Sequence, residues 1–511
     1  MKKYLKKLLA LMVALSMVLS FAACDSSTSS SGSADDEDEA SYDEGPSEDV
    51  IVVTDETELE AEGMKYVLIY NPEIYSELDR SDKSSHNTGY FGSQIMVDGD
   101  RGDELEDETN QYTPVSPSDL MQDFDWSTVN LEGDRGDTMG VDYDEGDLKE
   151  FYTHSYNMSR REKREFECVY SGEYCHIWVE NLRYSDYAEE YGEIFDEEIF
   201  EQVTESFGYP RFTSDDGGKV NILFYDLMEG LCGFFYQGDA FSSSEVSDGE
   251  ANRYCYNTNH DIININTWIL SDELCTSSTM AHEFQHLITF TNYFSTVNEV
   301  WCDTWMDEGM SGYIEEQLFP GTKENSGHFR SFNSSDLIRN GQSLYNFTTT
   351  DYDIGVYGSV YYFSEYLAEE SGGDVFSNFH EYWRESYSDT LCVSEALANS
   401  VSSDFYKKVN NTIDYDGYVD FESDDDEWMS KMTLNFYLHM LQEKDDFDPY
   451  DSIKVKKLLY DELDGTDIEG GGRIIVAVSD EYFEIPEDSD DGLIYVGLDE
   501  DFNVVTPFVY K

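Results

Sequence analysis

Residues 278–288 read STMAHEFQHLI and place two histidines, His282 and His286, four positions apart, with Glu283 directly after the first. Residues four apart share one face of an α-helix, so both imidazoles can reach one metal ion. Glu283 would lie beside them, where it can take a proton from water held by that ion without being a ligand itself. The spacing therefore predicts a helix that carries a zinc site. The alternative interpretation is a structural helix with two surface histidines.

A catalytic zinc needs a third protein ligand and an open fourth position. The segment 305–313 reads WMDEGMSGY and offers Glu308 as that ligand. Twenty-one residues separate His286 from Glu308, enough for a helix end, a loop and the start of an antiparallel helix. Gly312, four residues further on, puts no side chain on that face and would let the two helices approach. An exposed acidic helix is the alternative, and three other acids are rivals for the ligand role: Asp303, Asp307 and Glu315.

HEFQH followed by WMDEGMSGYIEE resembles the glutamate-zincin peptidases, and in detail the hyicolysin-type family of bacterial extracellular metallopeptidases. In that family an AHEFQH helix, preceded by a strand such as DIININT, is followed by a Trp-x-Asn-Glu-Gly-x-Ser segment. The resemblance implies a zinc cofactor, Glu283 as the general base, and a ligand set of His282, His286 and Glu308. Residues 232–235, CGFF, are similar to the family's Gly-Gly-Tyr-Phe segment, which would place them near the substrate edge of a sheet.

The resemblance covers roughly residues 175–380 and includes two departures. Asp307 replaces the usual Asn before the ligand glutamate, which adds a carboxylate near the site and can alter the affinity for the metal. Gly312 stands where thermolysin-like enzymes of the same clan place an Asp that orients a ligand histidine. The partner that orients the histidine must therefore come from elsewhere in the chain.

Hydrolysis of a peptide also needs a group that stabilises the oxyanion of the transition state. Residues 357–367 resemble the Tyr-x-x-Gly-x-x-x-x-x-Tyr-Leu segment of related zincins, whose first tyrosine can donate to the tetrahedral intermediate. Tyr357 is the matching residue, although Val360 stands where Gly is usual. A packed tyrosine in the core is the alternative interpretation of Tyr357. His328 and His380 are rivals for the same role.

The N-terminus has the pattern of an export signal: lysines, an apolar run over residues 8–21, and small residues before Cys24. Phe-Ala-Ala-Cys resembles the lipobox of bacterial lipoproteins, in which the cysteine is acylated and becomes the new N-terminus. Residues 25–63 are first rich in Ser and then in Asp and Glu, which is typical of a solvated tether. We therefore expect lipidation at Cys24; the alternative is an ordinary cleaved signal.

The hydrophobic patterns predict an α+β protein: a zincin-like catalytic domain with a mixed β-sheet, the HExxH helix and a helical subdomain, and an N-terminal β-rich module. Strands are expected at 175–180, 220–225, 261–267 (half exposed), 473–478 and 493–496, and helices at 194–207 and over much of 277–440. The expected division is a signal peptide (1–23), a tether (24–63), the β-rich module (64–174), the metallopeptidase domain (175–440) and a β-containing C-terminal region (441–511).

The net charge and the cysteines of the chain bear on the molecules that it can bind and on its disulfide bonds. With 31 Lys and Arg against 110 Asp and Glu, the net charge is −79, which makes the chain a poor binder of nucleic acid and favours a soluble monomer. Calcium is a second candidate cation, at three acidic segments that lack EF-hand spacing: 214–218, 424–427 and 488–492. The chain has eight cysteines; export would permit disulfides, and Cys168 and Cys175 are the closest pair in sequence after Cys24 is set aside.

These features together favour a surface-tethered zinc metalloendopeptidase that hydrolyses extracellular proteins or peptides and is anchored to the outer face of a membrane. The alternative from another class is a lipid-anchored zincin-fold protein that binds or adheres without turnover. The intact Glu283 argues against that alternative. An aminopeptidase lacks support, because the chain has no GxMEN segment to hold a substrate amine.

Overall fold

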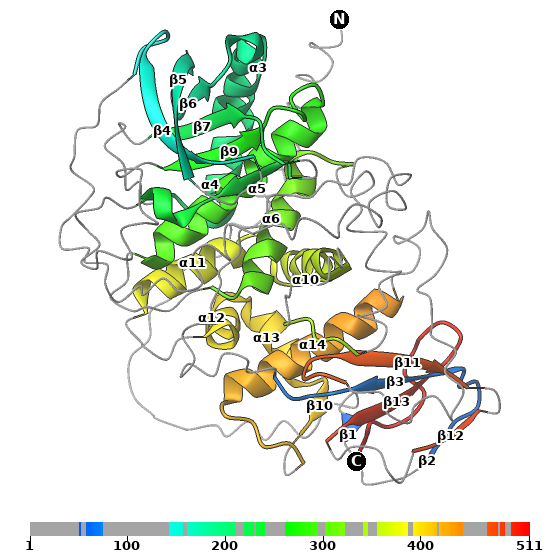
Figure 1. Cartoon of the computed structure of the whole chain (residues 1–511). Helices are drawn as coiled ribbons and strands as arrows, with labels where there is room; N and C mark the ends of the chain where they lie inside the picture. The colour runs from blue at the N-terminus through cyan, green and yellow to red at the C-terminus, as the bar shows by residue number, and fades with distance from the viewer. Residues whose placement is uncertain are drawn as a thin grey trace, which may run out of the picture. The chain divides into compact units, whose positions relative to one another are not determined.

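Figure 1 shows a computed structural model of the chain. The part of the chain that the structure describes comprises residues 51–52, 58–74, 143–156, 161–210, 219–228, 231–240, 261–294, 302–321, 341–345, 355–386, 392–415, 418–442, 468–478, 481–485 and 492–511. The predicted signal peptide and Cys24 lie outside these residues.

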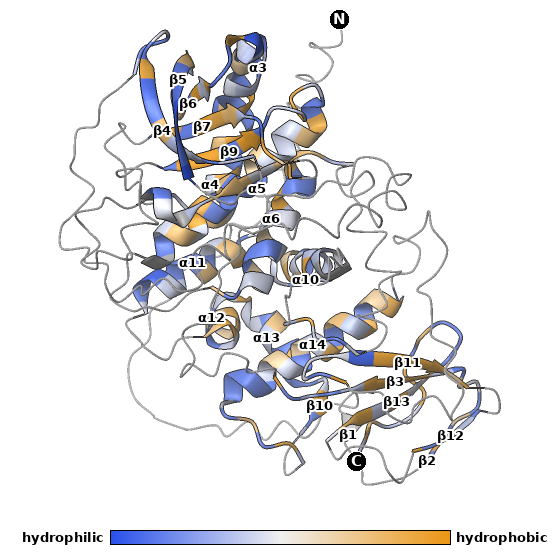
Figure 2. Cartoon of the chain, in the orientation of Figure 1, coloured by the Kyte–Doolittle hydropathy of each residue, from blue (hydrophilic) through white to orange (hydrophobic). Residues whose placement is uncertain are grey.

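A six-stranded mixed sheet supports the histidine-bearing helix. Its strands are β4 (Leu148–His154), β5 (Arg161–Ser171), β6 (Cys175–Val179), β7 (Val220–Tyr225), β8 (Gly233–Phe235) and β9 (Ile262–Asn266). The order is β4-β5-β6-β7-β9-β8. Neighbours from β6 to β9 run parallel, whereas β4, β5 and the edge strand β8 pair antiparallel with their neighbours. The strands β6 to β9 are buried along their whole length, and Figure 2 shows β7 and β9 in hydrophobic colours.

Strand β9 is more deeply buried than its sequence predicted. Its alternation of Ile and Asn predicted a half-exposed strand, yet every residue of β9 is buried. The asparagines tolerate burial because they are hydrogen bonded: Asn264 accepts from the Tyr225 hydroxyl (3.1 Å) and donates to the Phe234 carbonyl (3.2 Å). Asn266 donates to the carbonyl of Leu231 (2.6 Å). These bonds fasten β7 and the segment around β8 to β9, which lies between them in the sheet.

Helices fill much of the rest of the described chain. They are α3 (Ser185–Ile194), the π-helical η6 (Phe195–Ile199), α4 (Phe200–Phe207), α5 (Glu273–Phe294), α6 (Thr304–Leu318), α10 (Gly355–Ser371), α11 (Val375–Glu385), α12 (Val393–Ser400), α13 (Ser403–Asn410), α14 (Asp424–Gln442) and the short 3₁₀ turns η5 (Leu182–Tyr184) and η7 (Gln237–Ala240). The expected helices at 194–207 and after residue 277 are present. Within the described residues, no helix is long and apolar enough to cross a membrane.

Small residues on α6 allow it to lie close to α10. A Cβ atom on Gly309 would stand 2.7 Å from the Val360 carbonyl oxygen and 2.6 Å from the Ser364 hydroxyl, so only glycine fits there. A Cβ on Gly312 would contact Tyr361 of α10. Gly312 thus packs toward α10. Its predicted role was to let two helices approach around the metal, which would require it to face α5 instead.

A second sheet joins residues from the two ends of the described chain. Its strands are β3 (Tyr66–Tyr70), β11 (Arg473–Ala477), β13 (Ile494–Leu498) and β14 (Val509–Tyr510), in the order β11-β3-β13-β14. Two smaller pairings are β2 (Glu58–Glu60) with β12 (Tyr482–Glu484) and β1 (Ile51–Val52) with β10 (Ile413–Asp414). The Tyr70 hydroxyl donates to the Ser430 carbonyl of α14 (3.0 Å), which connects this sheet to the helices.

The expected fold class is confirmed: the chain combines a mixed sheet, a helix that carries the HExxH segment and further helices in an α+β arrangement. Strands on both sides of the predicted boundary at residue 175 pair with each other, because β5 and β6 are neighbours. Strand β3 of the predicted N-terminal module pairs with two strands of the C-terminal region. Among the acidic segments, 214–218 is outside the described residues, and 424–427 forms the first turn of α14.

Candidate metal centre

Two neighbouring helices bring together the three residues expected to bind zinc. His282 and His286 lie on α5 and Glu308 lies on α6; all three are buried, and their ligand atoms lie within 4.8 Å of one another. The Glu308 Oε2 atom stands 3.3 Å from His282 Nε2 and 3.7 Å from His286 Nε2. The Nε2 atoms of both rings therefore converge on one carboxylate.

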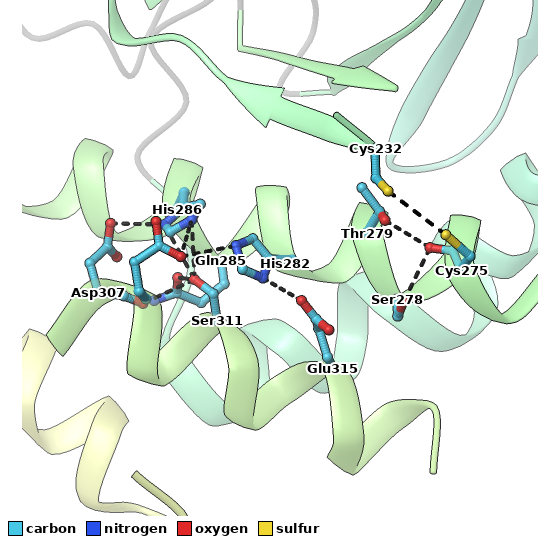
Figure 3. Close-up of polar contacts among 11 residues, drawn as sticks. Cys232, Cys275, Ser278, Thr279, His282, Gln285, His286, Asp307, Ser311 and Glu315 are labelled. Atoms are coloured by element: carbon cyan, nitrogen blue, oxygen red, sulfur yellow. Dashed lines mark hydrogen bonds and ion pairs between the residues drawn. The ribbon is translucent and has the colours of Figure 1, made fainter. Parts of the chain in front are cut away.

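The other nitrogen of each histidine contacts a second carboxylate. His282 Nδ1 lies 2.5 Å from Glu315 Oε1, and His286 Nδ1 lies 2.8 Å from Asp307 Oδ2 (Figure 3). Since an ionised carboxylate only accepts, each Nδ1 carries the proton, and each Nε2 presents a lone pair. This is the tautomer that a histidine ligand needs, and a carboxylate that holds it also raises the basicity of the imidazole.

The charge and hydrogen bonding of the cluster fit a divalent cation. Four buried acids surround the two imidazoles: Glu283, Asp307, Glu308 and Glu315. His282 Nε2 and both carboxylate oxygens of Glu308 are buried without a hydrogen-bond partner among the described residues. Buried charges and polar atoms are stable only when they are paired or bind a metal. A donor set of two imidazoles and one carboxylate is also the set that catalytic zinc uses.

The pKa shifts of the two histidines also indicate that the cluster fits a cation. Burial alone would lower the pKa of His282, but the Glu315 and Glu308 carboxylates raise it well above its usual value. For His286, the carboxylates of Asp307 and Glu308 likewise outweigh burial and raise the pKa. The cluster therefore attracts positive charge at this point, whether a proton or a metal ion supplies it.

Glu283 lies next to His282 on α5 and is not one of the three residues whose ligand atoms converge. Its side chain is buried, and neither carboxylate oxygen has a hydrogen-bond partner within the described part of the chain. Burial raises the pKa of Glu283 to about 7; the neighbouring Glu308 and Glu315 carboxylates add to the rise, and the two histidines oppose it. An unpaired carboxylate of this kind is suited to exchange a proton near neutral pH.

Tyr357 lies on α10 and is buried near the same carboxylates. Burial, followed by the charges of Glu308, Glu283 and Glu315, raises the pKa of its hydroxyl well above the usual value, so the tyrosine remains a donor. Its rival His380 has Nδ1 bonded to the Phe207 carbonyl (2.7 Å), and burial lowers its pKa to about 4. The other rival, His328, lies outside the described residues.

Comparison with known proteins shows similarity in sequence to a metalloprotease. Over 264 residues the chain is 27% identical to the neutral metalloprotease ShpI of Staphylococcus hyicus, across 50% of this chain and 58% of the relative. The chain is thus a distant homologue of a metalloprotease. No family model matches the chain. Among solved structures, yeast LTA4 hydrolase in complex with bestatin aligns with 58% of this chain and 39% of its own, at 13% identity and a TM-score of 0.28.

The homology agrees with the resemblance that the motifs indicated. Residues 232–235, expected near the substrate edge of a sheet, include β8, and β8 is the last strand in the order of the six-stranded sheet. Strand β8 pairs with β9 and contacts the histidine-bearing helix α5, since Gly233 closely approaches Thr279.

The carboxylates that orient the histidines were not predicted in that role. From the sequence alone, Asp307 and Glu315 are rival ligands; in the structure their carboxylates contact the Nδ1 atoms of the two rings instead. A signal for Glu315 exists in the spacing: it follows Glu308 by seven residues, which is two helical turns and returns it to the same face. Glu315 therefore supplies the orienting contact that Gly312 cannot.

A further polar contact holds the two helices in register. The Ser311 hydroxyl donates to the side-chain carbonyl of Gln285, and the Gln285 amide donates to the Thr289 hydroxyl (2.8 Å). Ser311 also lies 3.2 Å from His286 Nδ1. These buried bonds link α6 to α5 beside the ligands, which fixes the spacing of the histidines and Glu308.

Replacing Glu315 by Ala should weaken zinc binding by about 10–100-fold, because His282 would lose the partner that fixes its ring and tautomer. Competition with a chromogenic chelator would measure the affinity. Glu316→Ala is the matched control, since the Glu316 carboxylate accepts from the Gly321 N–H at the end of α6. Equal affinities of the two variants would show that Glu315 has no orienting role.

Proposed function

We propose that the chain is a zinc-dependent endopeptidase that hydrolyses peptide bonds of extracellular proteins. The observation that carries this proposal is the convergence of His282, His286 and Glu308 next to the unpaired, buried carboxylate of Glu283. The distant homology to a neutral metalloprotease supports the same reaction class.

His282, His286 and Glu308 would hold the zinc ion. When bound, zinc acts as a Lewis acid that polarises the substrate carbonyl and lowers the pKa of water. Glu283 then accepts a proton from the attacking water and passes it to the nitrogen of the leaving amine. Tyr357, kept protonated by its surroundings, is proposed to donate to the developing oxyanion.

Strand β8 is the proposed place for the substrate backbone. It stands at the end of the sheet order and contacts α5, so an extended peptide added along it would lie beside the metal ligands. Main-chain hydrogen bonds of this kind recognise peptides with little dependence on their side chains. Protein or peptide substrates are therefore expected, rather than small molecules.

Digestion of casein tests this function. We expect the purified chain to release peptides from casein, to lose this activity when a chelator removes the metal, and to regain it when zinc is added back. Hydrolysis that persists unchanged without metal would contradict the proposal. Absence of hydrolysis in a zinc-loaded, folded protein would favour the alternative, a zincin-fold protein that binds or adheres without turnover.

The location of the protein is a second part of the proposal. We propose that Cys24 is lipidated and that the chain is held at the outer face of a membrane, as the lipobox-like sequence before Cys24 indicates. A monomer is expected from the high negative charge. Calcium at the acidic segments stays a prediction without structural support.

In cells, the wild-type chain should partition into detergent with the membranes, and Cys24→Ser should release it or block its processing. Phase separation in detergent followed by immunoblotting measures this. Cys392→Ser is the control, because its thiol lies far from the N-terminus in sequence. Wild-type protein found wholly in the medium would contradict the anchor.

A further inference from the structure

Two cysteines lie in contact between the edge strand β8 and the first turn of the histidine-bearing helix. Cys232 directly precedes β8, Cys275 lies near the start of α5, and their Sγ atoms are 4.0 Å apart (Figure 3). Both side chains are buried. This pair differs from the one that sequence proximity favoured, Cys168 and Cys175.

Hydrogen bonds fix the backbone on both sides of this contact. The carbonyl of Cys232 accepts from the Asn266 N–H (2.7 Å), which holds it to β9. The carbonyl of Cys275 accepts from the hydroxyls of Ser278 (3.1 Å) and Thr279 (2.8 Å). The backbone of each cysteine is thus held by its own element, and the two side chains bring their sulfur atoms into contact.

Strand β8 and helix α5 also pack closely against each other beside the two cysteines. A Cβ atom on Gly233 would stand 2.7 Å from Thr279 Cγ2, so the glycine next to Cys232 permits this distance. The Cys275 N–H is bonded to Asp272 Oδ1 (3.2 Å), which anchors the start of the helix. A covalent bond between the sulfurs would therefore join two segments that are already in contact.

We infer that Cys232 and Cys275 form a disulfide bond when the chain meets a disulfide oxidant. The thiolate of one cysteine attacks the oxidant and releases one thiol, and the second cysteine attacks the resulting mixed disulfide and releases the other. An S–S bond forms in the protein, two cysteine protons are lost, and the oxidant is reduced by two electrons to two thiols.

The surroundings of the thiols determine when this bond can form. The contact with Cys232, followed by burial, raises the pKa of Cys275 well above its usual value. Since the thiolate is the reactive species, the folded pair exchanges slowly, and the bond forms most readily while the chain folds. Once formed, it is shielded from reductants by the same burial.

The bond would tie the edge strand to the metal-binding helix. Cys275 precedes His282 by seven residues, or two helical turns, so the link would fix the distance between β8 and the turn that leads to the ligands. It would also close a loop between residues 43 positions apart, which lowers the entropy of the unfolded chain. The inference rests on the fold and does not depend on the proposed function.

Peptide mapping of the full chain tests the inference. The chain is refolded with a mixture of reduced and oxidised glutathione, denatured without further reductant and treated with iodoacetamide. We expect the peptides that contain Cys232 and Cys275 to be joined and unlabelled, and to separate and label after reduction. Complete labelling of both cysteines, or pairing of either with another cysteine, would overturn the inference.

Stability measurements give a second readout. The thermal midpoint of the wild type should be several degrees higher when oxidised than when reduced. The double variant Cys232→Ser/Cys275→Ser should show no such difference, while Cys392→Ser, which removes a thiol outside the pair, should behave as the wild type. If the double variant fails to fold, peptide mapping of the wild type still decides the question. Equal midpoints for oxidised and reduced wild type would also count against the bond.

Discussion

Replacing Glu283 by Gln should leave zinc bound and lower the rate of casein hydrolysis by about 10²–10⁴-fold. Glutamine preserves the size of the side chain but cannot accept the proton from water. Zinc binding should persist, because the Nε2 atoms of His282 and His286 face Glu308 and not Glu283. Metal analysis and an activity assay on the same preparation measure both quantities.

The control for this experiment is Glu189→Gln, which removes an exposed acid on α3. It should hydrolyse casein at the wild-type rate. Full activity of Glu283→Gln would refute Glu283 as the base. Loss of zinc from Glu283→Gln would mean instead that Glu283 is a ligand.

Replacing His286 by Ala should abolish stoichiometric zinc binding and, with it, casein hydrolysis. The variant keeps one imidazole and one carboxylate, which is fewer than the three protein ligands of a catalytic zinc site. The ratio of zinc to protein, measured by mass spectrometry of the metal after dialysis, should fall from about one to near zero.

His439→Gln provides a matched control, because His439 is a partly exposed histidine near the end of α14. It should retain about one zinc per chain. Circular dichroism would verify that His286→Ala is folded, since this variant leaves the buried Asp307 without its histidine partner. A folded His286→Ala protein with unchanged zinc content would place the metal elsewhere.

Local patterns in the sequence were sufficient to find the residues that the structure gathers into a possible metal site. The four-residue spacing of His282 and His286 depends only on helix geometry, and the structure places both rings on one face of α5. Glu308 was harder to choose, because the chain contains 110 acidic residues and several stand nearby. The resemblance of its flanking residues selected it, and the structure brings it to the two histidines.

The roles of the neighbouring acids could not be decided from the sequence. Whether a carboxylate near two histidines binds the metal or orients a ring depends on which ring atom it faces. Asp307 and Glu315 face Nδ1 atoms, whereas Glu308 faces the Nε2 atoms. That distinction follows from the packing of α6 on α5, which is a tertiary contact.

The pairing of strands could not be predicted from the sequence either. The pattern over 64–174 indicated a β-rich module and the apolar run at 473–478 a strand, but a strand pattern does not name its partner. In the structure β3 and β11 pair across about 400 residues of chain. The burial of β9 was also missed, because hydrogen-bonded asparagines can occupy the interior of a sheet.

X-ray absorption at the zinc edge of the purified, zinc-loaded chain would identify the atoms that bind the metal. We expect one zinc with nitrogen and oxygen donors only, and the outer scattering of two imidazole rings, from His282 and His286. The spectrum would contradict the account if it showed sulfur donors, which would move the metal to cysteines, or if it lacked imidazole scattering.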